Sequence, residues 1–289
     1  MPMLTTRDGT QIYYRDWGKG QPVLFSHGWP LTGDAWENQM MFLRAHGYRV
    51  IAHDRRGNGR SDQPDFGNDV DSWADDLADL IAELDLEDVV LVGHSTGGGE
   101  VARYIGRHGT GRVAKVVLLD SMVPRMLQAP DNPAGVPIEA IDQIRAGTVG
   151  SRSQFFKDVT APFFSANREE SKVTQGMRDL FWFQGLQGGA LAQYETSFSW
   201  QLDYTEDAKR IDVPTLVIHG DDDQIVPIDA GGRAAAKIIA DVRLIVYSGG
   251  NHGIAITDPD RVNADLLAFI QEQPASASPE TSAAEPTPA

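Results

Sequence analysis

The chain has 289 residues, a formal net charge of −16 and no cysteine. The negative charge makes nucleic acids and anionic membranes poor partners, and the lack of cysteine excludes disulfides, iron–sulfur clusters and thiol nucleophiles. The 41% of hydrophobic residues suffice for a sizeable core. No apolar run has membrane-spanning length and no basic-then-apolar leader is recognisable, so we expect a cytoplasmic protein.

The first 121 residues alternate short apolar runs with helical patterns. Around Asp8-Gly9, two polar–aromatic runs predict an antiparallel hairpin at a sheet edge. Apolar strands are expected at 22–26, 48–53, 89–92 and 113–119, and helices at 35–46, 72–86 and 100–108. This alternation predicts a mostly parallel sheet covered by helices on both faces.

The pattern changes at residue 122, where strands disappear and aromatic residues cluster as far as residue 210. We interpret this segment as a helical cap inserted over the carboxyl ends of the strands. Alternation then resumes, with strands at 214–219 and 243–247 and helices at 229–240 and from 259 onward. The predicted units are a core of residues 1–121 and 211–273, a cap of residues 122–210 and, from their Pro, Ala, Ser, Thr and Glu content, a disordered tail at 274–289.

The motif Gly-x-Ser-x-Gly at residues 93–97 indicates a candidate catalytic serine. It lies between an apolar strand and a helical pattern, which is the context of a nucleophile elbow, a sharp turn that exposes a serine hydroxyl above the sheet. The alternative is a glycine-rich turn with an incidental serine. Three consecutive glycines at 97–99 favour the elbow, because each costs about 1 kcal/mol relative to alanine in a helix. Ser95 is therefore the candidate nucleophile.

A serine hydroxyl needs a base to accept its proton. His252 is the favoured base, since it follows the last strand in a glycine-rich loop that can reach back over the elbow. His94 precedes the serine, and its side chain is expected to point away from it. His53 and His219 lie at strand ends and are expected to make structural hydrogen bonds.

The base in turn needs an acid that holds its tautomer. Three aspartates follow the strand at 214–219, in the chain order serine, acid, histidine that is expected on this kind of sheet. We favour Asp223, the furthest past the strand, over Asp221. Asp120, which follows an earlier strand, is a further alternative.

An acyl-transfer site also needs donors for the developing oxyanion. The backbone N–H of Thr96 accompanies the elbow, and the loop after the strand at 22–26 offers the N–H of Trp29. Pro30 has a fixed φ and no N–H, so it stiffens the Trp29 carbonyl beside the site. The alternative for this loop is an ordinary turn.

Five motifs together resemble the α/β-hydrolase superfamily, and more narrowly its cofactor-free haloperoxidases or perhydrolases, which overlap with bacterial aryl esterases. The motifs are at residues 26–36, 54–61, 93–98, 219–227 and 250–253, and the similarity covers residues 3–272. The resemblance implies an α/β-hydrolase fold, with a mostly parallel eight-stranded sheet and a helical cap. It also implies that neither haem nor metal takes part.

The resemblance implies a triad of Ser95, Asp223 and His252, with Trp29 and Thr96 as oxyanion donors. Ser95 would form an acyl-enzyme, from which water releases an acid and hydrogen peroxide releases a peracid that oxidises halide. A proline at position 30 is common in the haloperoxidases, where the carbonyl before it is thought to place peroxide. Position 96 often holds methionine, so threonine should make the pocket floor more polar. Related members include plain aryl esterases and γ-lactamases and often form homo-oligomers.

The aromatic segment predicts an apolar pocket suited to short acyl chains and aryl leaving groups. The predicted lining is Pro30, Phe156, Phe164, Trp182, Phe198 and Ile225. Dehalogenases and epoxide hydrolases would need a carboxylate nucleophile, which Ser95 argues against. A hydroxynitrile lyase could use the same triad. A ligand-binding protein that kept the fold without turnover is the alternative from another class.

Overall fold

The computed structural model describes residues 1–272, so the predicted tail lies outside the described residues. Within them, eight strands form one sheet in the order β1-β2-β4-β3-β5-β6-β7-β8. β1 pairs antiparallel with β2, and β2 with β4, whereas all other neighbours are parallel. The mostly parallel sheet and the hairpin at its edge are therefore confirmed.

The strands are β1 (Met3–Thr5), β2 (Gln11–Trp17), β3 (Pro22–Ser26), β4 (Arg49–His53), β5 (Val89–His94), β6 (Val113–Leu119), β7 (Thr215–Gly220) and β8 (Val242–Tyr247). The α-helices are α1 (Glu37–Ala45), α2 (Val70–Glu83), α3 (Thr96–His108), α4 (Ile138–Val149), α5 (Arg152–Phe163), α6 (Gln175–Gln187), α7 (Ala190–Thr196), α8 (Thr205–Ala208), α9 (Gly232–Ala235), α10 (Ile254–Thr257) and α11 (Pro259–Gln271). Two 3₁₀ helices are η1 (Gly33–Trp36) and η2 (Ser197–Gln201).

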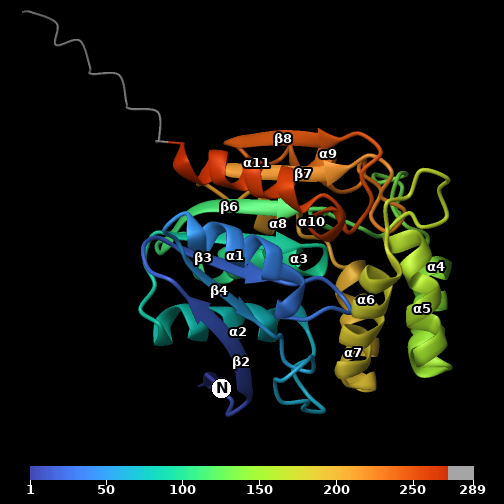
Figure 1. The fold of residues 1–289 in the computed structure, drawn as a ribbon, viewed down its shortest axis with the longest axis horizontal. Coiled ribbons are helices and arrows are strands. Elements are labelled where there is room, and N and C mark those ends of the chain that lie inside the picture. The colour runs from blue at the N-terminus through green and yellow to red at the C-terminus, as the bar shows by residue number, and fades with distance from the viewer. Residues whose placement is uncertain (273–289) are drawn as a thin grey trace, which may run out of the picture.

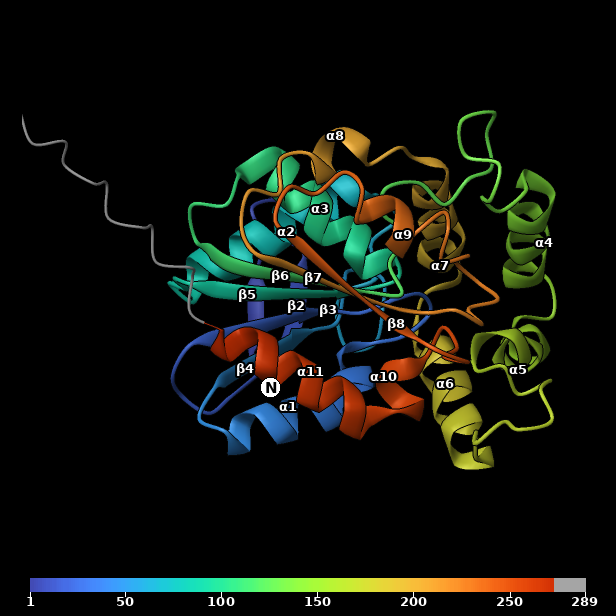
Figure 2. The same cartoon turned by 90° about the horizontal axis from the view of Figure 1, so that it is seen from above.

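Helices cover both faces of the sheet (Figure 1). Seen from above, α2, α3, α8 and α9 lie on one face and α1, α10 and α11 on the other, while α4 to α7 gather beyond the ends of the strands (Figure 2). These four helices fall within residues 122–210; the division of the chain into core and cap units stays a prediction. None of the helices in residues 1–272 combines the length and apolar character needed to cross a bilayer.

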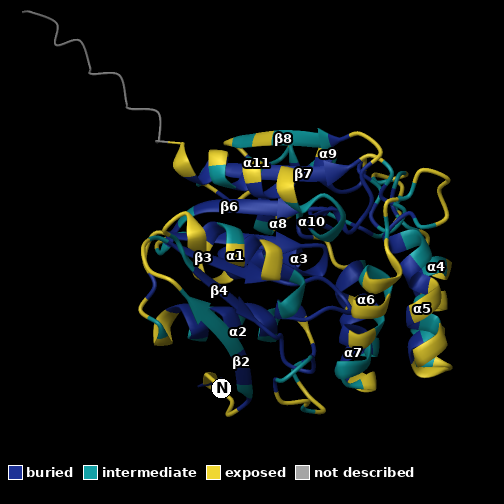
Figure 3. Ribbon diagram, viewed as in Figure 1, coloured by how far each residue is buried: buried dark blue, intermediate teal, exposed yellow. Residues whose placement is uncertain are grey.

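The sheet is buried on both faces because its central strands are mostly apolar (Figure 3). In β5, Val89 and Leu91 face the hydrophobic cluster under α2 and α3, whereas Val90 and Val92 face the cluster under α1 and α11. Alternate residues of a strand point to opposite faces, so an unbroken apolar run serves two cores. Burial of each such side chain stabilises the fold by about 1.5–3 kcal/mol.

Several predicted helices differ from the structure in their bounds. The helix expected at 229–240 is only α9, Gly232–Ala235. Its start packs directly against β7 and the segment after β6: a Cβ on Gly231 would lie 2.6 Å from the Ser121 carbonyl oxygen. The helix expected at 35–46 divides into η1 and α1. The helix expected at 72–86 starts two residues earlier, where the Asp69 side chain accepts a hydrogen bond from the Ser72 N–H.

The junction between β5 and α3 is packed against the end of β3. A Cβ on Gly97 would collide with the backbone carbonyl oxygens of Ser26 and His27, and a Cβ on Gly93 would meet the Gly97 carbonyl. Only glycine allows backbones to approach this closely. The turn that carries Ser95 is therefore fixed against the loop that follows β3.

We predict that Gly97→Ala lowers the free energy of unfolding by about 1–3 kcal/mol, because the methyl group meets backbone rather than a movable side chain. Helix propensity alone would predict the opposite sign. Urea unfolding measures the change. Gly111→Ala is the matched control, since a Cβ at Gly111 has open space around it. Equal stability of Gly97→Ala and wild type would contradict the packing argument.

Candidate active site

Ser95 is placed at the tip of a strained turn. It lies between β5 and α3 with φ 53° and ψ −119°, a conformation that residues other than glycine rarely adopt. Such strain costs about 1–3 kcal/mol and persists where the surroundings dictate it. Here the Ser95 N–H donates to the Leu119 carbonyl at 3.0 Å, which fixes the turn to β6. The serine is buried except for 7% of its surface.

The loop after β8 brings His252 to the serine. His252 Nε2 is 2.9 Å from the Ser95 Oγ, across 157 residues of sequence. Its Nδ1 is 2.7 Å from the Asp223 Oδ2. The Phe163 ring packs edge-on against the imidazole, with centroids 4.9 Å apart at 90°. These contacts bring the three residues predicted as a triad into one continuous hydrogen-bonded chain.

The neighbouring aspartates are engaged elsewhere. Asp221 is exposed and accepts a hydrogen bond from the Gly249 N–H at 2.6 Å. Asp222 forms an ion pair with Arg168 at 2.6 Å. Of the three adjacent carboxylates, only Asp223 contacts His252 among the described residues.

Asp223 is held as an acceptor on both oxygens. Its Oδ1 accepts hydrogen bonds from the backbone N–H groups of Ile225 and Val226, each at 2.8 Å. Burial opposes its ionisation, but the neighbouring imidazoles of His252 and His219 outweigh burial and lower the pKa of Asp223 below its usual range. The carboxylate thus stays ionised and can orient the His252 N–H.

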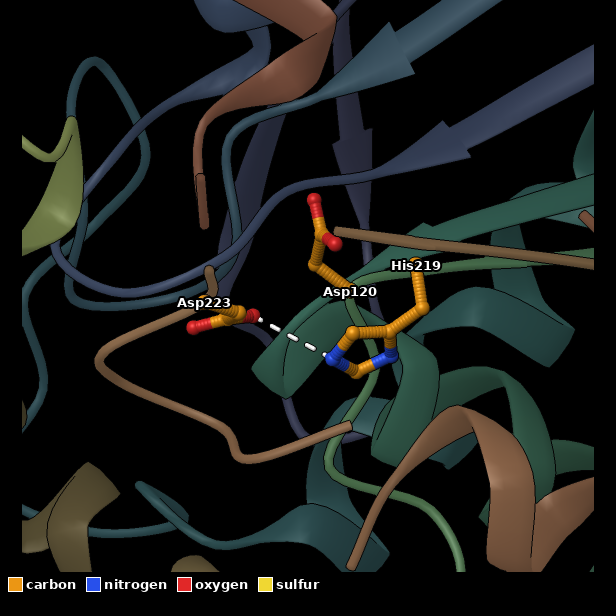
Figure 4. Close-up of side chains that lie close together, drawn as sticks. All are labelled: Asp120, His219 and Asp223. Carbon is orange, nitrogen blue, oxygen red and sulfur yellow. Dashed lines mark ion pairs between the residues drawn. The ribbon is translucent and has the colours of Figure 1, made fainter. Parts of the chain in front are cut away.

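Asp120 and His219 lie beside Asp223, at the ends of β6 and β7 (Figure 4). Polar atoms of Asp120, His219 and Asp223 all lie within 4.8 Å of one another, a spacing compatible with a metal ion. Burial, opposed by His219 but reinforced by the charge of Asp223, raises the pKa of Asp120 well above its ordinary value. A protonated carboxyl group is a poor ligand for a cation.

The hydrogen bonds of His219 also argue against a metal. Its Nδ1 accepts from the Gly232 N–H at 3.2 Å, so the proton lies on Nε2. That N–H faces the Val226 carbonyl at 2.9 Å and the Asp223 Oδ2 at 3.3 Å. Both ring nitrogens are therefore occupied by hydrogen bonds. We interpret the cluster as support for the Asp223 carboxylate, and His219 as the structural hydrogen-bonding residue that the sequence predicts.

The loop after β3 lies directly against Ser95. A Cβ on Gly28 would lie 3.0 Å from the Ser95 Cβ, so a glycine is needed for this approach. The Gly28 carbonyl accepts hydrogen bonds from His27 Nδ1 at 2.8 Å and the Leu31 N–H at 3.0 Å. Carbonyl and N–H of one trans peptide point in opposite directions, so the Trp29 N–H is directed away from these two donors.

The N–H groups of Trp29 and Thr96 are both available to a ligand. Neither donates to a protein acceptor within residues 1–272. Buried N–H groups are rarely left without an acceptor unless a ligand or water meets them. They belong to the two segments that meet at Ser95, where the sequence predicts an oxyanion hole.

A cavity of about 270 Å³ adjoins Ser95 and His252. Aromatic and aliphatic side chains form most of its wall. The lining residues are Trp29, Ser95, Met126, Ala140, Gln143, Ile144, Phe155, Val159, Pro162, Phe163, Trp200, Gln224, Ile225 and His252. A larger hollow of about 680 Å³ lies between residues 164–173 and the loop after β8, and it does not include Ser95.

Of the predicted pocket residues, Ile225 is in this lining and five are not. Phe156 is fully buried, Phe164 borders the larger hollow instead, and Phe198 is 46% exposed. Trp182 turns its indole N–H to the Ser153 carbonyl at 3.0 Å. Pro30 is buried next to the lining residue Trp29.

Phe156 and Phe164 lie outside the lining for one physical reason. Successive residues of a helix point about 100° apart, so of two adjacent aromatics only one can face the cavity. In α5 it is Phe155 rather than Phe156, and at its end Phe163 rather than Phe164. Without the helix orientation, sequence does not choose between the members of such a pair.

Comparison with known proteins places this geometry in a family. A protein-family sequence model, described as the alpha/beta hydrolase fold, matches residues 21–259. The chain belongs to the α/β-hydrolase family. It is 52% identical to a non-heme chloroperoxidase of Kitasatospora aureofaciens, covering 94% of this chain and 100% of the relative. It is 46% identical to a bifunctional esterase/perhydrolase of Acinetobacter calcoaceticus, with the same two coverages.

A solved α/β-hydrolase structure is similar over the same extent. The crystal structure of a bromoperoxidase from Bacillus anthracis superposes with a TM-score of 0.91 at 35% identity. It covers 94% of this chain and 99% of that chain. The α/β-hydrolase fold, with its helices beyond the strand ends, is thus shared with a haloperoxidase.

Sequence reasoning missed a buried ion-pair network in this α/β hydrolase. The Arg55 guanidinium donates to Glu100 in α3 at 2.6 Å and to the His27 carbonyl at 2.6 Å. Burial opposes ionisation of Glu100, but Arg55 and His53 outweigh it and lower its pKa to about 2. The sequence signal that could have indicated this network is an arginine just past β4 together with a glutamate near the start of the helix that follows the elbow.

His94 gives a pH-dependent test of the site. It is buried, with its Nε2 2.8 Å from the His252 carbonyl oxygen. Burial and the adjacent His252 lower the pKa of His94 to about 3. The unfolded chain gains a proton there below about pH 6.5, so it binds more protons than the folded chain, and stability falls as pH falls from about 6.5 toward 3.

We predict that wild type loses about 2 kcal/mol more unfolding free energy than His94→Gln between pH 7 and pH 5. Glutamine keeps an N–H donor but cannot be protonated. Urea midpoints at the two pH values give the difference. His46→Gln, at an exposed histidine near the end of α1, is the control. Identical pH dependence in His94→Gln and wild type would refute the assignment of a neutral His94.

Proposed function

We propose that this α/β hydrolase is a serine esterase that forms an acyl-enzyme on Ser95. The observation that carries the proposal is the hydrogen-bonded chain of Ser95, His252 and Asp223, with links of 2.9 and 2.7 Å. It opens onto a cavity of about 270 Å³, at the small end of ligand pockets. Small carboxylic esters are the substrates that this size favours.

In the first half-reaction the Ser95 Oγ attacks the ester carbonyl carbon and its proton passes to His252 Nε2. Asp223 stabilises the resulting imidazolium through Nδ1. The carbonyl oxygen becomes negatively charged and accepts hydrogen bonds from the Trp29 and Thr96 N–H groups, each worth about 3–4 kcal/mol in this kind of site. His252 then returns the proton to the leaving alkoxide, which departs as the alcohol and leaves the acyl-enzyme.

In the second half-reaction His252 takes a proton from the incoming nucleophile. Water gives the carboxylic acid and free Ser95. Hydrogen peroxide gives a peracid and free Ser95. The peracid transfers one oxygen to a halide ion and yields hypohalous acid plus the carboxylate. The names of the relatives, a non-heme chloroperoxidase and an esterase/perhydrolase, support peroxide as the second acceptor in this chain.

Several related expectations remain predictions. A plain aryl esterase or γ-lactamase would use the same residues without notable perhydrolysis. A non-catalytic binding protein would leave the triad geometry without a role, which makes it the weaker alternative. The cytoplasmic location and the formation of homo-oligomers also stay predictions from sequence.

We predict that Ser95→Ala reduces hydrolysis of p-nitrophenyl acetate by about a thousandfold or more. Without the hydroxyl no acyl-enzyme forms. Release of p-nitrophenol from the purified protein measures the rate, and circular dichroism verifies folding. Equal rates from the variant and wild type would end the assignment of Ser95 as nucleophile.

Asp223→Asn is expected to lower kcat by about 10³- to 10⁴-fold, because asparagine holds His252 in the wrong tautomer. Asp221→Asn is the matched control, since this neighbouring carboxylate is exposed and its hydrogen bond is to the Gly249 N–H instead of His252. The same assay compares them. A large loss in Asp221→Asn with none in Asp223→Asn would reverse the choice of acid.

Perhydrolysis is tested separately. With acetate and hydrogen peroxide, the protein is expected to brominate monochlorodimedone in the presence of bromide, and Ser95→Ala is expected to lose this activity. The halogenation should require acetate, since the peracid is the oxidant. Ester hydrolysis without acetate-dependent bromination would support the esterase activity and contradict the perhydrolase activity.

A further inference from the structure

One hydrogen bond joins the elbow to the cap segment over the cavity. The indole Nε1–H of Trp200 donates to the Thr96 Oγ1 at 3.0 Å. Both residues are buried, with 4% and 1% of their surfaces exposed. Thr96 is the residue after the proposed nucleophile, and Trp200 lies in η2, 104 positions further along the chain.

Trp200 forms part of the cavity wall together with Trp29. The two indole rings pack edge to face, with centroids 5.3 Å apart at 83°. Trp29 Nε1 donates to the Gln193 carbonyl at 3.2 Å, so each ring is fixed at its N–H as well as by the other ring. The orientation of this wall therefore depends on the acceptor that Thr96 supplies.

The chemistry assigns the two sides of the cavity. His252 must protonate the leaving group, so the leaving group lies on the side of His252, where Phe163 packs edge-on at 4.9 Å. The carbonyl oxygen faces the N–H groups of Trp29 and Thr96. The acyl chain is then directed away from His252, toward the wall made by Trp29 and Trp200.

We propose that the hydrogen bond between Thr96 and Trp200 restricts the enzyme to short acyl chains. This inference rests on the proposed function and makes Thr96 a specificity-determining residue through its side chain, in addition to its backbone N–H. A buried indole N–H without an acceptor is costly. When Thr96 cannot accept, the Trp200 ring turns toward another partner and the acyl side of the cavity lengthens.

The test compares Thr96→Val, which is nearly isosteric but cannot accept a hydrogen bond, with Thr96→Ser, which can. The measured quantity is the ratio of kcat/KM for p-nitrophenyl hexanoate to that for p-nitrophenyl acetate. We expect the ratio to rise about tenfold or more in Thr96→Val and to stay near the wild-type ratio in Thr96→Ser. An equal rise in both variants would show that volume, not the hydrogen bond, is responsible, and would overturn the proposal.

Trp200→Phe supplies the independent arm, because it removes the N–H and keeps an aromatic ring. If the hydrogen bond sets the selectivity, Trp200→Phe and Thr96→Val change the ratio non-additively, and the double variant resembles either single variant. Additive changes would contradict the proposal. Phe198→Ala is the control in η2, since this aromatic is 46% exposed and outside the cavity lining.

The outcomes distinguish failure of the proposed function from failure of this inference. If Ser95→Ala hydrolyses both esters like wild type, the proposed function fails. If hydrolysis depends on Ser95 but the chain-length ratio is the same in Thr96→Val, Trp200→Phe and wild type, the esterase stands and this inference fails. Should Thr96→Val not fold, the ratio in Trp200→Phe decides alone.

Discussion

The close approach of α3 to the end of β3 is the constraint on which the site depends. Gly97 lies against the carbonyl oxygens of Ser26 and His27 with no room for a side chain. This contact brings the elbow and the loop after β3 together, so that Gly28 lies next to Ser95, the proposed nucleophile. Neither loop could shift alone without breaking backbone packing, which explains how the strained conformation of Ser95 is maintained.

Buried charge strengthens the same junction. Arg55, in the loop after β4, forms a fully buried ion pair with Glu100 in the first turns of α3. Arg55 also donates a hydrogen bond to the His27 carbonyl. Such a pair adds little net stability over apolar packing, but losing one partner is costly. We therefore interpret the pair as a contact that holds the junction between α3 and the loop after β3 in one geometry. The proposed oxyanion donors would then be oriented before substrate arrives, which is the condition under which such donors lower a barrier most.

Much of this arrangement could be predicted from sequence because the informative residues follow strands. Ser95, Asp223 and His252 each lie just past a strand of a parallel sheet, and the carboxyl ends of parallel strands meet at one edge. The order of motifs therefore indicated which side chains would meet.

The cavity wall could not be predicted in the same way. Its residues come from helices whose rotation depends on packing that sequence patterns do not specify, so adjacent aromatics such as Phe155 and Phe156 are indistinguishable. The ion pair of Arg55 and Glu100 joins two segments that are unremarkable when read separately. Hydrogen bonds such as that between Trp200 and Thr96 depend on one rotamer each and leave no trace in spacing.

The division of labour between these parts has an evolutionary consequence. The proposed reacting groups lie on loops that follow strands of the sheet, whereas most of the cavity wall comes from the stretch between β6 and β7. Drift in that stretch can reshape what is accepted while the reaction itself is inherited unchanged. Enzymes built this way can change their substrate range quickly. Two relatives with the same three reacting side chains need not act on the same substrate.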